Sequence, residues 1–151
     1  MSSENNVHLK GTFQHEEYRA ADDIEPAMLI ELNSDGEVIP HSTEGGRAEL
    51  LFAEINVLNG EDMEDDYEDD DLVMCNLELA GNRVQLILTA GEDVDIGDML
   101  ISAGDGQVIE NGNEDSSTTV VQIIATALEA LDLSASGAVD GLIEARLMPG
   151  A

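Results

Sequence analysis

The sequence predicts an all-β fold, namely a single compact β-barrel or β-sandwich of short strands and hairpins with an extended N-terminal arm. Short aliphatic and β-branched runs recur along the chain, and Gly, Asn and Asp separate them. Two of these separations contain Asp-Gly, the strongest short-range hairpin signal. Closely spaced strands of this kind are typical of barrels and sandwiches. The 151 residues, 42% of them apolar, can bury one core but hardly two, so we expect one domain.

The N-terminal segment, residues 1–20, is predicted to be an arm or edge segment beside a barrel domain formed by residues 21–151. It is polar, and its apolar residues show no sustained period. They should therefore stay outside the chain's own core and serve as contacts for a partner surface. These candidate contact residues are Val7, Leu9, Phe13 and Tyr18.

Two hairpins are predicted, each centred on an Asp-Gly turn. Residues 28–32 and 37–39 flank Asp35-Gly36, and residues 99–101 and 107–109 flank Asp105-Gly106. Both hairpins share the pattern Met-Leu-Ile before the turn and Val-Ile after it. This similarity favours an internal duplication of a β unit, with chance convergence as the alternative.

Further strands are indicated by alternation. Cys75, Leu77 and Leu79 alternate with polar residues, as do the apolar residues of 143–147, so each strand should bury one face. Residues 84–89 form another β-rich run. Residues 120–131 combine helical spacing with a high density of β-branched residues. We predict a strand for the first half, and leave strand or helix open for residues 125–131.

Residues 61–71 form a run dominated by Asp and Glu, which we expect to be a solvated loop because such a charge density cannot be buried. A specific calcium site is the alternative interpretation of this run, but the run lacks the glycine and the spaced Asp/Asn pattern of an EF-hand loop. Loose association with Na⁺, K⁺ or Mg²⁺ is therefore expected, and no specific metal or cofactor site is predicted.

The charge balance is extreme. Thirty-four Asp and Glu against five Lys and Arg give a formal net charge of −29, whereas roughly 2 to 8 charges suffice to keep a small domain soluble. The acidic residues are spread along the whole chain, so the self-repulsion falls on the folded body. In about 1 M salt the Debye length is about 3 Å, which removes most of this repulsion. The composition thus predicts a halophilic protein; the alternative is a merely acidic mesophilic surface protein.

This charge also excludes several partners. Binding to nucleic acid or to an anionic membrane requires clustered Lys and Arg. The cations are expected to be scattered singly, with no basic patch between them: Lys10, Arg19, Arg47, Arg83 and Arg146. No segment has the roughly 18 apolar residues that cross a bilayer, and the first ten residues lack the apolar core of a secretion signal. We expect a soluble protein made in a cytoplasm, with no nucleic-acid or membrane partner.

Catalytic chemistry is not visible in the sequence. The three histidines are far apart, no serine lies in a Gly-x-Ser-x-Gly turn, and the single cysteine, Cys75, lies inside an apolar run that predicts burial. Carboxylates are so abundant that no particular pair is informative. We predict no catalytic residues and no enzyme.

The order of short blocks resembles the capsid decoration, or cement, proteins of tailed viruses. The blocks that carry the resemblance are residues 24–32, 35–38, His41, 45–46, Ala48, 51–54, 58–60, 66–67, 97–102, 104–106 and 125–130. The resemblance covers roughly residues 24–148. The acidic run of residues 61–71 departs from it, because a Gly-Asp turn is usual at that place.

The resemblance implies a β-barrel subunit that binds the major capsid protein on the outer capsid surface as a homotrimer, stabilises the icosahedral shell, and has no catalytic residues. Together with the charge, it indicates a tailed virus of a halophilic archaeon and a shell that functions in high salt. The competing hypothesis is an acidic halophilic binding module, or an accessory subunit of a soluble complex.

Overall fold

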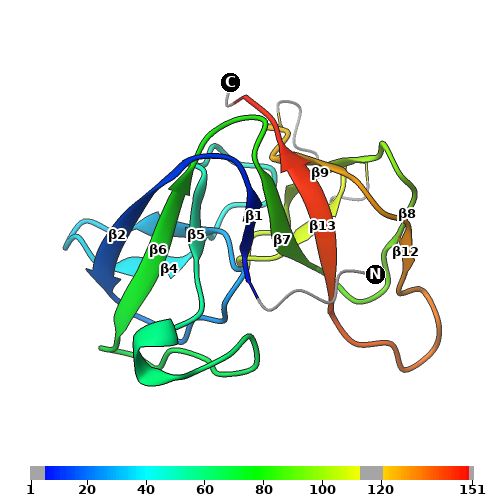
Figure 1. The fold of residues 1–151 in the computed structure, drawn as a ribbon. Coiled ribbons are helices and arrows are strands. Elements are labelled where there is room, and N and C mark those ends of the chain that lie inside the picture. The colour runs from blue at the N-terminus through cyan, green and yellow to red at the C-terminus, as the bar shows by residue number, and fades with distance from the viewer. Residues whose placement is uncertain (1–5, 113–120, 150–151) are drawn as a thin grey trace.

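Short strands joined by tight turns build the computed structural model, which describes residues 6–112 and 121–149. The fold is all-β, as predicted (Figure 1), and the one helical element in these residues is a 3-10 turn, η1 (Val57–Asn59). No helix among them is long and apolar enough to span a membrane. The strands are β1 (His8–Lys10), β2 (Phe13–Arg19), β3 (Ile30–Leu32), β4 (Val38–Pro40), β5 (Leu51–Ala53), β6 (Leu72–Glu78), β7 (Arg83–Leu88), β8 (Asp93–Val94), β9 (Met99–Ser102), β10 (Val108–Glu110), β11 (Ala125–Ala127), β12 (Leu131–Asp132) and β13 (Gly141–Leu147).

A five-stranded barrel forms one half of the molecule. The strands follow one another in the order β7-β10-β9-β11-β13, and β13 pairs back onto β7 to close the ring. Six residue pairs make this closing contact, from Gly141 opposite Leu88 to Arg146 opposite Arg83. The apolar residues of β13 alternate as predicted, and Ile143, Ala145 and Leu147 are buried.

A second, three-stranded sheet of order β2-β6-β5 lies beside the barrel, and β1 lies between the two in Figure 1. The β3–β4 hairpin joins this half through backbone bridges from Leu29 to Phe52 and from Ala20 to Val38. One continuous core cluster connects both halves. The core of the described residues is therefore shared by two sheets, and the division into an arm, residues 1–20, and a barrel domain, residues 21–151, stays a prediction.

Both predicted hairpins are present. In the first, β3 pairs with β4, and the Asn33 side-chain oxygen accepts hydrogen bonds from the Asp35 and Glu37 amides at 2.9 and 3.0 Å. Gly36 takes a φ of 77°, a conformation that costs glycine little. In the second, β9 pairs with β10, and both strands belong to the barrel sheet. The two hairpins belong to different sheets, and the proposed duplication stays a prediction.

The strand predicted for the first half of residues 120–131 is wrong for the residues that the structure describes there. Paired β-structure begins only at Ala125. Within residues 125–131, left open between strand and helix, residues 125–127 form β11, and Leu131 begins β12. Before Ala125, Gln122 is held differently: its side-chain amide bonds both to the Ala48 N–H and to the Ala48 carbonyl, each at 3.0 Å. The side chain of Gln122 thus holds this part of the chain where a paired strand was expected. Thr118, Thr119 and Val120 lie outside the described residues.

The alternation predicted for Cys75, Leu77 and Leu79 is only partly correct, because Cys75 is buried as expected but its polar neighbours are buried as well. Asn76 and Glu78, expected to face solvent, are 1% and 3% exposed, whereas Leu79 is 57% exposed. The reason is that polar partners from other segments cover these side chains. Asn76 donates to the Glu54 carboxylate at 2.9 Å, and Glu78 accepts from Asn82 at 2.9 Å. Burial of a polar side chain is tolerated once it is hydrogen-bonded.

The acidic run is largely solvated, as expected, but Tyr67 pins its middle to the core. Tyr67 is 2% exposed and exchanges two backbone hydrogen bonds with Ile24, at 2.7 and 2.9 Å. Its hydroxyl donates to the Glu54 carbonyl at 2.5 Å. Burial is the main cause that raises the pKa of this phenol, which therefore stays a donor at neutral pH.

We predict that Tyr67→Phe lowers the free energy of unfolding by about 1 to 2 kcal/mol, because a buried hydrogen bond is lost while the ring remains packed. Urea denaturation at constant salt measures the change. The control is Tyr18→Phe, whose hydroxyl bonds to the Glu16 side chain at the surface and should change stability by less than about 0.5 kcal/mol. Equal losses in the two variants would contradict the anchoring role of Tyr67.

Candidate contact surface

The four predicted contact residues are placed differently from one another. Val7 is fully buried in the chain's own core, so the expectation that it stays outside that core is wrong. Leu9 is half-buried in β1, and Tyr18 packs partly against the core from β2. Phe13, at the start of β2, keeps 39% of its surface exposed. Phe13 is therefore the most available of the four for an outside partner.

The segment that contains them is paired along most of its described length. β1 is an edge strand on β7, and β2 is an edge strand on β6 with seven residue pairs. An edge position was one of the two predicted alternatives. Between the two strands, Gly11 turns the chain with a φ of 111°, and a Cβ here would lie 2.0 Å from the Asn82 side-chain oxygen. Only glycine allows this crossing without displacing Asn82.

A carboxylate clamp, formed by Glu54, holds the N-terminal segment in place. The Glu54 carboxylate accepts hydrogen bonds from the Val7 amide at 2.9 Å and the His8 amide at 3.1 Å. It also accepts from the Ile55 amide and, as described above, from Asn76. Four donors around one carboxylate are charge-assisted bonds, which are stronger than neutral ones. Sequence reasoning missed Glu54 because its partners lie far along the chain.

A second polar contact supports β1 from the other side. His8 Nδ1 lies 2.8 Å from the Glu78 carboxylate, whose side chain is fully buried. The His8 ring also packs on Phe13, with ring centroids 4.3 Å apart. This ring contact fixes the Phe13 side chain beside Thr12, Gln14, Leu77 and Leu79, which together line an apolar depression of about 360 Å³.

His41 forms an arrangement that superficially suggests catalysis. Its Nδ1 lies 2.6 Å from the Ser102 hydroxyl, and its Nε2 lies 2.8 Å from the Arg47 carbonyl. Since a carbonyl only accepts, Nε2 carries a proton and donates to Arg47. Both side chains are fully buried, so no substrate reaches them. The arrangement joins the loop after β4 to β9.

Cys75 is buried as predicted, and burial raises the pKa of its thiol to about 12. The thiol is therefore protonated at neutral pH, and the thiolate is the reactive form. Among residues 6–112 and 121–149 there is also no group of three or more His, Cys, Asp or Glu side chains that could hold a metal ion.

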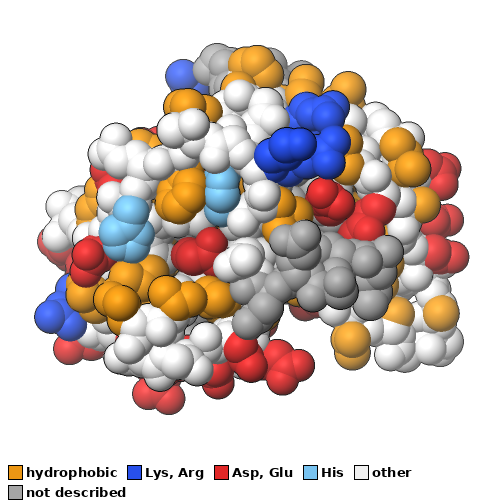
Figure 2. All heavy atoms as spheres, in the orientation of Figure 1, with side chains coloured by type: hydrophobic (Ala, Val, Ile, Leu, Met, Phe, Trp, Pro, Cys, Tyr) orange, Lys and Arg blue, Asp and Glu red, His pale blue; other side chains and the backbone are white. Residues whose placement is uncertain are grey.

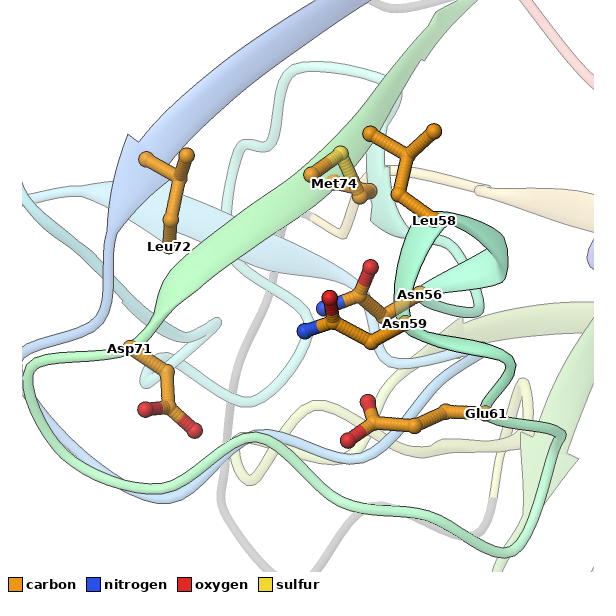
Figure 3. A pocket seen from close by; sticks show the side chains of 7 residues that line it. All are labelled: Asn56, Leu58, Asn59, Glu61, Asp71, Leu72 and Met74. Atoms are coloured by element: carbon orange, nitrogen blue, oxygen red, sulfur yellow. The ribbon is translucent and has the colours of Figure 1, made fainter.

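One polar pocket lies where the acidic run meets β6. It has a volume of about 320 Å³, and Figure 3 shows Glu61, Asp71 and the amides of Asn56 and Asn59 around it, with Leu58, Leu72 and Met74 above. Carboxylate and amide oxygens suit hydrated Na⁺, K⁺ or Mg²⁺. Loose cation association at residues 61–71 stays a prediction.

Exposed side chains of two kinds lie on the face drawn in Figure 2. Hydrophobic side chains are exposed over η1 and the lower part of β6, where Val57, Leu58 and Leu72 are 62%, 79% and 39% exposed. Lys and Arg side chains gather over the upper part of β7 and β13. The expectation that the cations are scattered singly is therefore wrong: β-pairing sets Arg83 opposite both Lys10 and Arg146.

These features define the class of the fold: an all-β barrel protein with an attached three-stranded sheet. The fold is similar to that of the head fiber gp8.5 N base of bacteriophage phi29, with a TM-score of 0.55. The likeness covers 90% of this chain and 94% of the phage chain at 18% sequence identity, and it shows a shared fold. No protein-family model matches the chain, and no curated protein matches its sequence.

We predict that Glu54→Ala lowers the free energy of unfolding by about 2 to 4 kcal/mol, because four donors, two of them in the N-terminal segment, lose a charged acceptor. The matched control is Glu49→Ala, which removes the same charge from an exposed position and should change stability by less than about 0.5 kcal/mol. Denaturation by urea at one salt concentration compares the two. If Glu54→Ala were as stable as Glu49→Ala, the clamp would contribute nothing.

Proposed function

We propose that the chain is a structural virion protein that binds the outside of an icosahedral capsid as a homotrimer and stabilises the shell in high salt. The observation that carries the proposal is the likeness to a phage head fiber base over nearly the whole length of both chains. The order of sequence blocks, which resembles capsid decoration proteins, points to the same class independently. The major capsid protein is the proposed partner, and the proposed role is not enzymatic.

The apolar depression around Phe13 supports a contact with the shell. Phe13, at the start of β2, is 39% exposed, and Leu79, directly after β6, is 57% exposed. The position of Phe13 is fixed by β-pairing and by the His8 ring. A rigid apolar side chain loses little conformational entropy on binding. Apolar contact also gains strength in salting-out conditions, whereas attraction between charges is screened. We therefore assign the capsid contact to Phe13 and Leu79.

Attachment can be tested on capsids stripped of this protein. We predict that Phe13→Asp and Leu79→Asp reduce rebinding, measured by co-sedimentation in high salt, by at least about tenfold each, since each buries a charge in an apolar contact. Val139→Asp is the control, because Val139 is 76% exposed on a loop outside the depression. Unchanged rebinding by both test variants would move the capsid contact to another surface.

High salt is proposed as the working environment because a charge of −29 on 16.1 kDa repels itself at low ionic strength. We predict that the melting temperature rises steadily as NaCl or KCl increases from about 0.1 M to several molar, a range that takes the Debye length from about 10 Å to below 3 Å. A melting temperature that stays flat across this range would contradict the halophilic assignment.

A further inference from the structure

Three of the five cations of the chain lie together on the barrel, on a surface that we call the basic face: Lys10, Arg83 and Arg146. They are widely separated in sequence but occupy three neighbouring strands. Lys10 of β1 and Arg146 of β13 both lie opposite Arg83 of β7. Neighbouring strands are about 4.8 Å apart, so the three positions fall within about 10 Å. Figure 2 shows Lys and Arg side chains gathered in this region.

The basic face is only partly compensated within the chain. Arg83, whose side chain is 41% exposed, has the Glu144 carboxylate 3.8 Å away. Lys10 and Arg146 are exposed, and among residues 6–112 and 121–149 neither has an ion-pair partner. Like charges on directly opposed strand positions destabilise a sheet. In a chain with 34 acidic residues, keeping three cations adjacent and open to solvent favours an acidic partner.

The strongest acidic surface of the same chain lies at the other end of the molecule. In Figure 1 the loop after η1 is at the bottom, whereas the start of β7 and the end of β13 are at the top. This loop, residues 61–71, carries nine carboxylates, and Tyr67 holds its middle against the core. Loop and basic face therefore cannot meet within one subunit. They are free to meet between two subunits.

We propose that the loop of residues 61–71 of one subunit docks on the basic face of the next subunit, and that this head-to-tail contact joins the homotrimer. The inference rests on the proposed function for the number of subunits only. A contact between two different surfaces is heterologous, and it forms a closed ring when the rotation between subunits is a simple fraction of a turn. Complementary charges fix the register of such a contact and exclude the opposite pairing. High salt screens exposed charges, but ion pairs that the contact itself buries are screened much less, so the docked pairs persist in high salt.

The test uses two charge-reversed variants of the full chain. The face variant carries Lys10→Glu, Arg83→Glu and Arg146→Glu. The loop variant carries Glu64→Lys, Glu68→Lys and Asp69→Lys, because these three exposed side chains take part in no hydrogen bond or ion pair among the described residues. Melting curves check that both variants fold. If the face variant does not fold, Lys10→Gln with Arg146→Gln replaces it, since both positions are exposed.

Sedimentation velocity in salt at which the chain is folded then measures self-association. Each variant alone should associate at least about tenfold more weakly than the unmodified chain. The loop variant is the more informative of the two. Each of its three replacements changes a negative charge into a positive one, so the formal net charge moves from −29 to −23. General repulsion therefore falls while association is expected to weaken. Arg47→Glu, a charge reversal at an exposed position outside both the basic face and the loop of residues 61–71, should leave association unchanged.

Mixing the two charge-reversed variants decides the case. The acidic face of one variant then meets the basic loop of the other, so the mixture should form a heterodimer although neither variant associates alone. A closed ring of three is not expected from the mixture, because it would contain at least one contact between identical variants. A trimer formed by both variants separately would overturn the basic-face contact and leave the proposed homotrimer intact. A mixture that does not assemble, or an unmodified chain that stays monomeric, would overturn the contact, whereas attachment to stripped capsids is measured independently of it.

Discussion

The backbone pairing between β7 and β13 is the interaction on which the rest of the structure depends. Without it, β7 would be joined only to β1 and to a single residue of β10, and the five strands would form an open sheet. Closure satisfies the backbone groups that an edge would expose. It also brings Arg83 and Arg146 together and leaves the opposite side of β7 available for β1. The outer surface of the barrel is thus a consequence of how the barrel closes.

The parts of the fold that sequence reasoning predicted are those determined by neighbouring residues. The turn at Asp35-Gly36 could be recognised because a glycine with positive φ and an Asn side chain that caps the turn are local features. The alternation of Ile143, Ala145 and Leu147 was equally informative because solvent lies on one side of that strand. Burial of Cys75 followed from the apolar residues around it.

The parts that sequence reasoning missed depend on contacts between distant segments. Glu78 reads as a surface residue until His8 and Asn82, from two other segments, cover it with hydrogen bonds. Val7 lacks a periodic pattern because it is a single residue inserted beside β7 rather than part of a long buried strand. The grouping of Lys10 with Arg83 requires knowing that β1 pairs with β7, and no spacing within the sequence carries that information.

The position of β2 has a consequence for the order in which the chain is made. His15 pairs with Asn76, and His8 pairs with Val84, so β1 and β2 leave the ribosome long before their partner strands β7 and β6. Such non-local pairing slows folding and leaves strand edges open in the meantime. The charges of Glu16, Glu17 and Arg19 then act before the native state exists, because a charged edge resists pairing with the same edge of a neighbouring nascent chain.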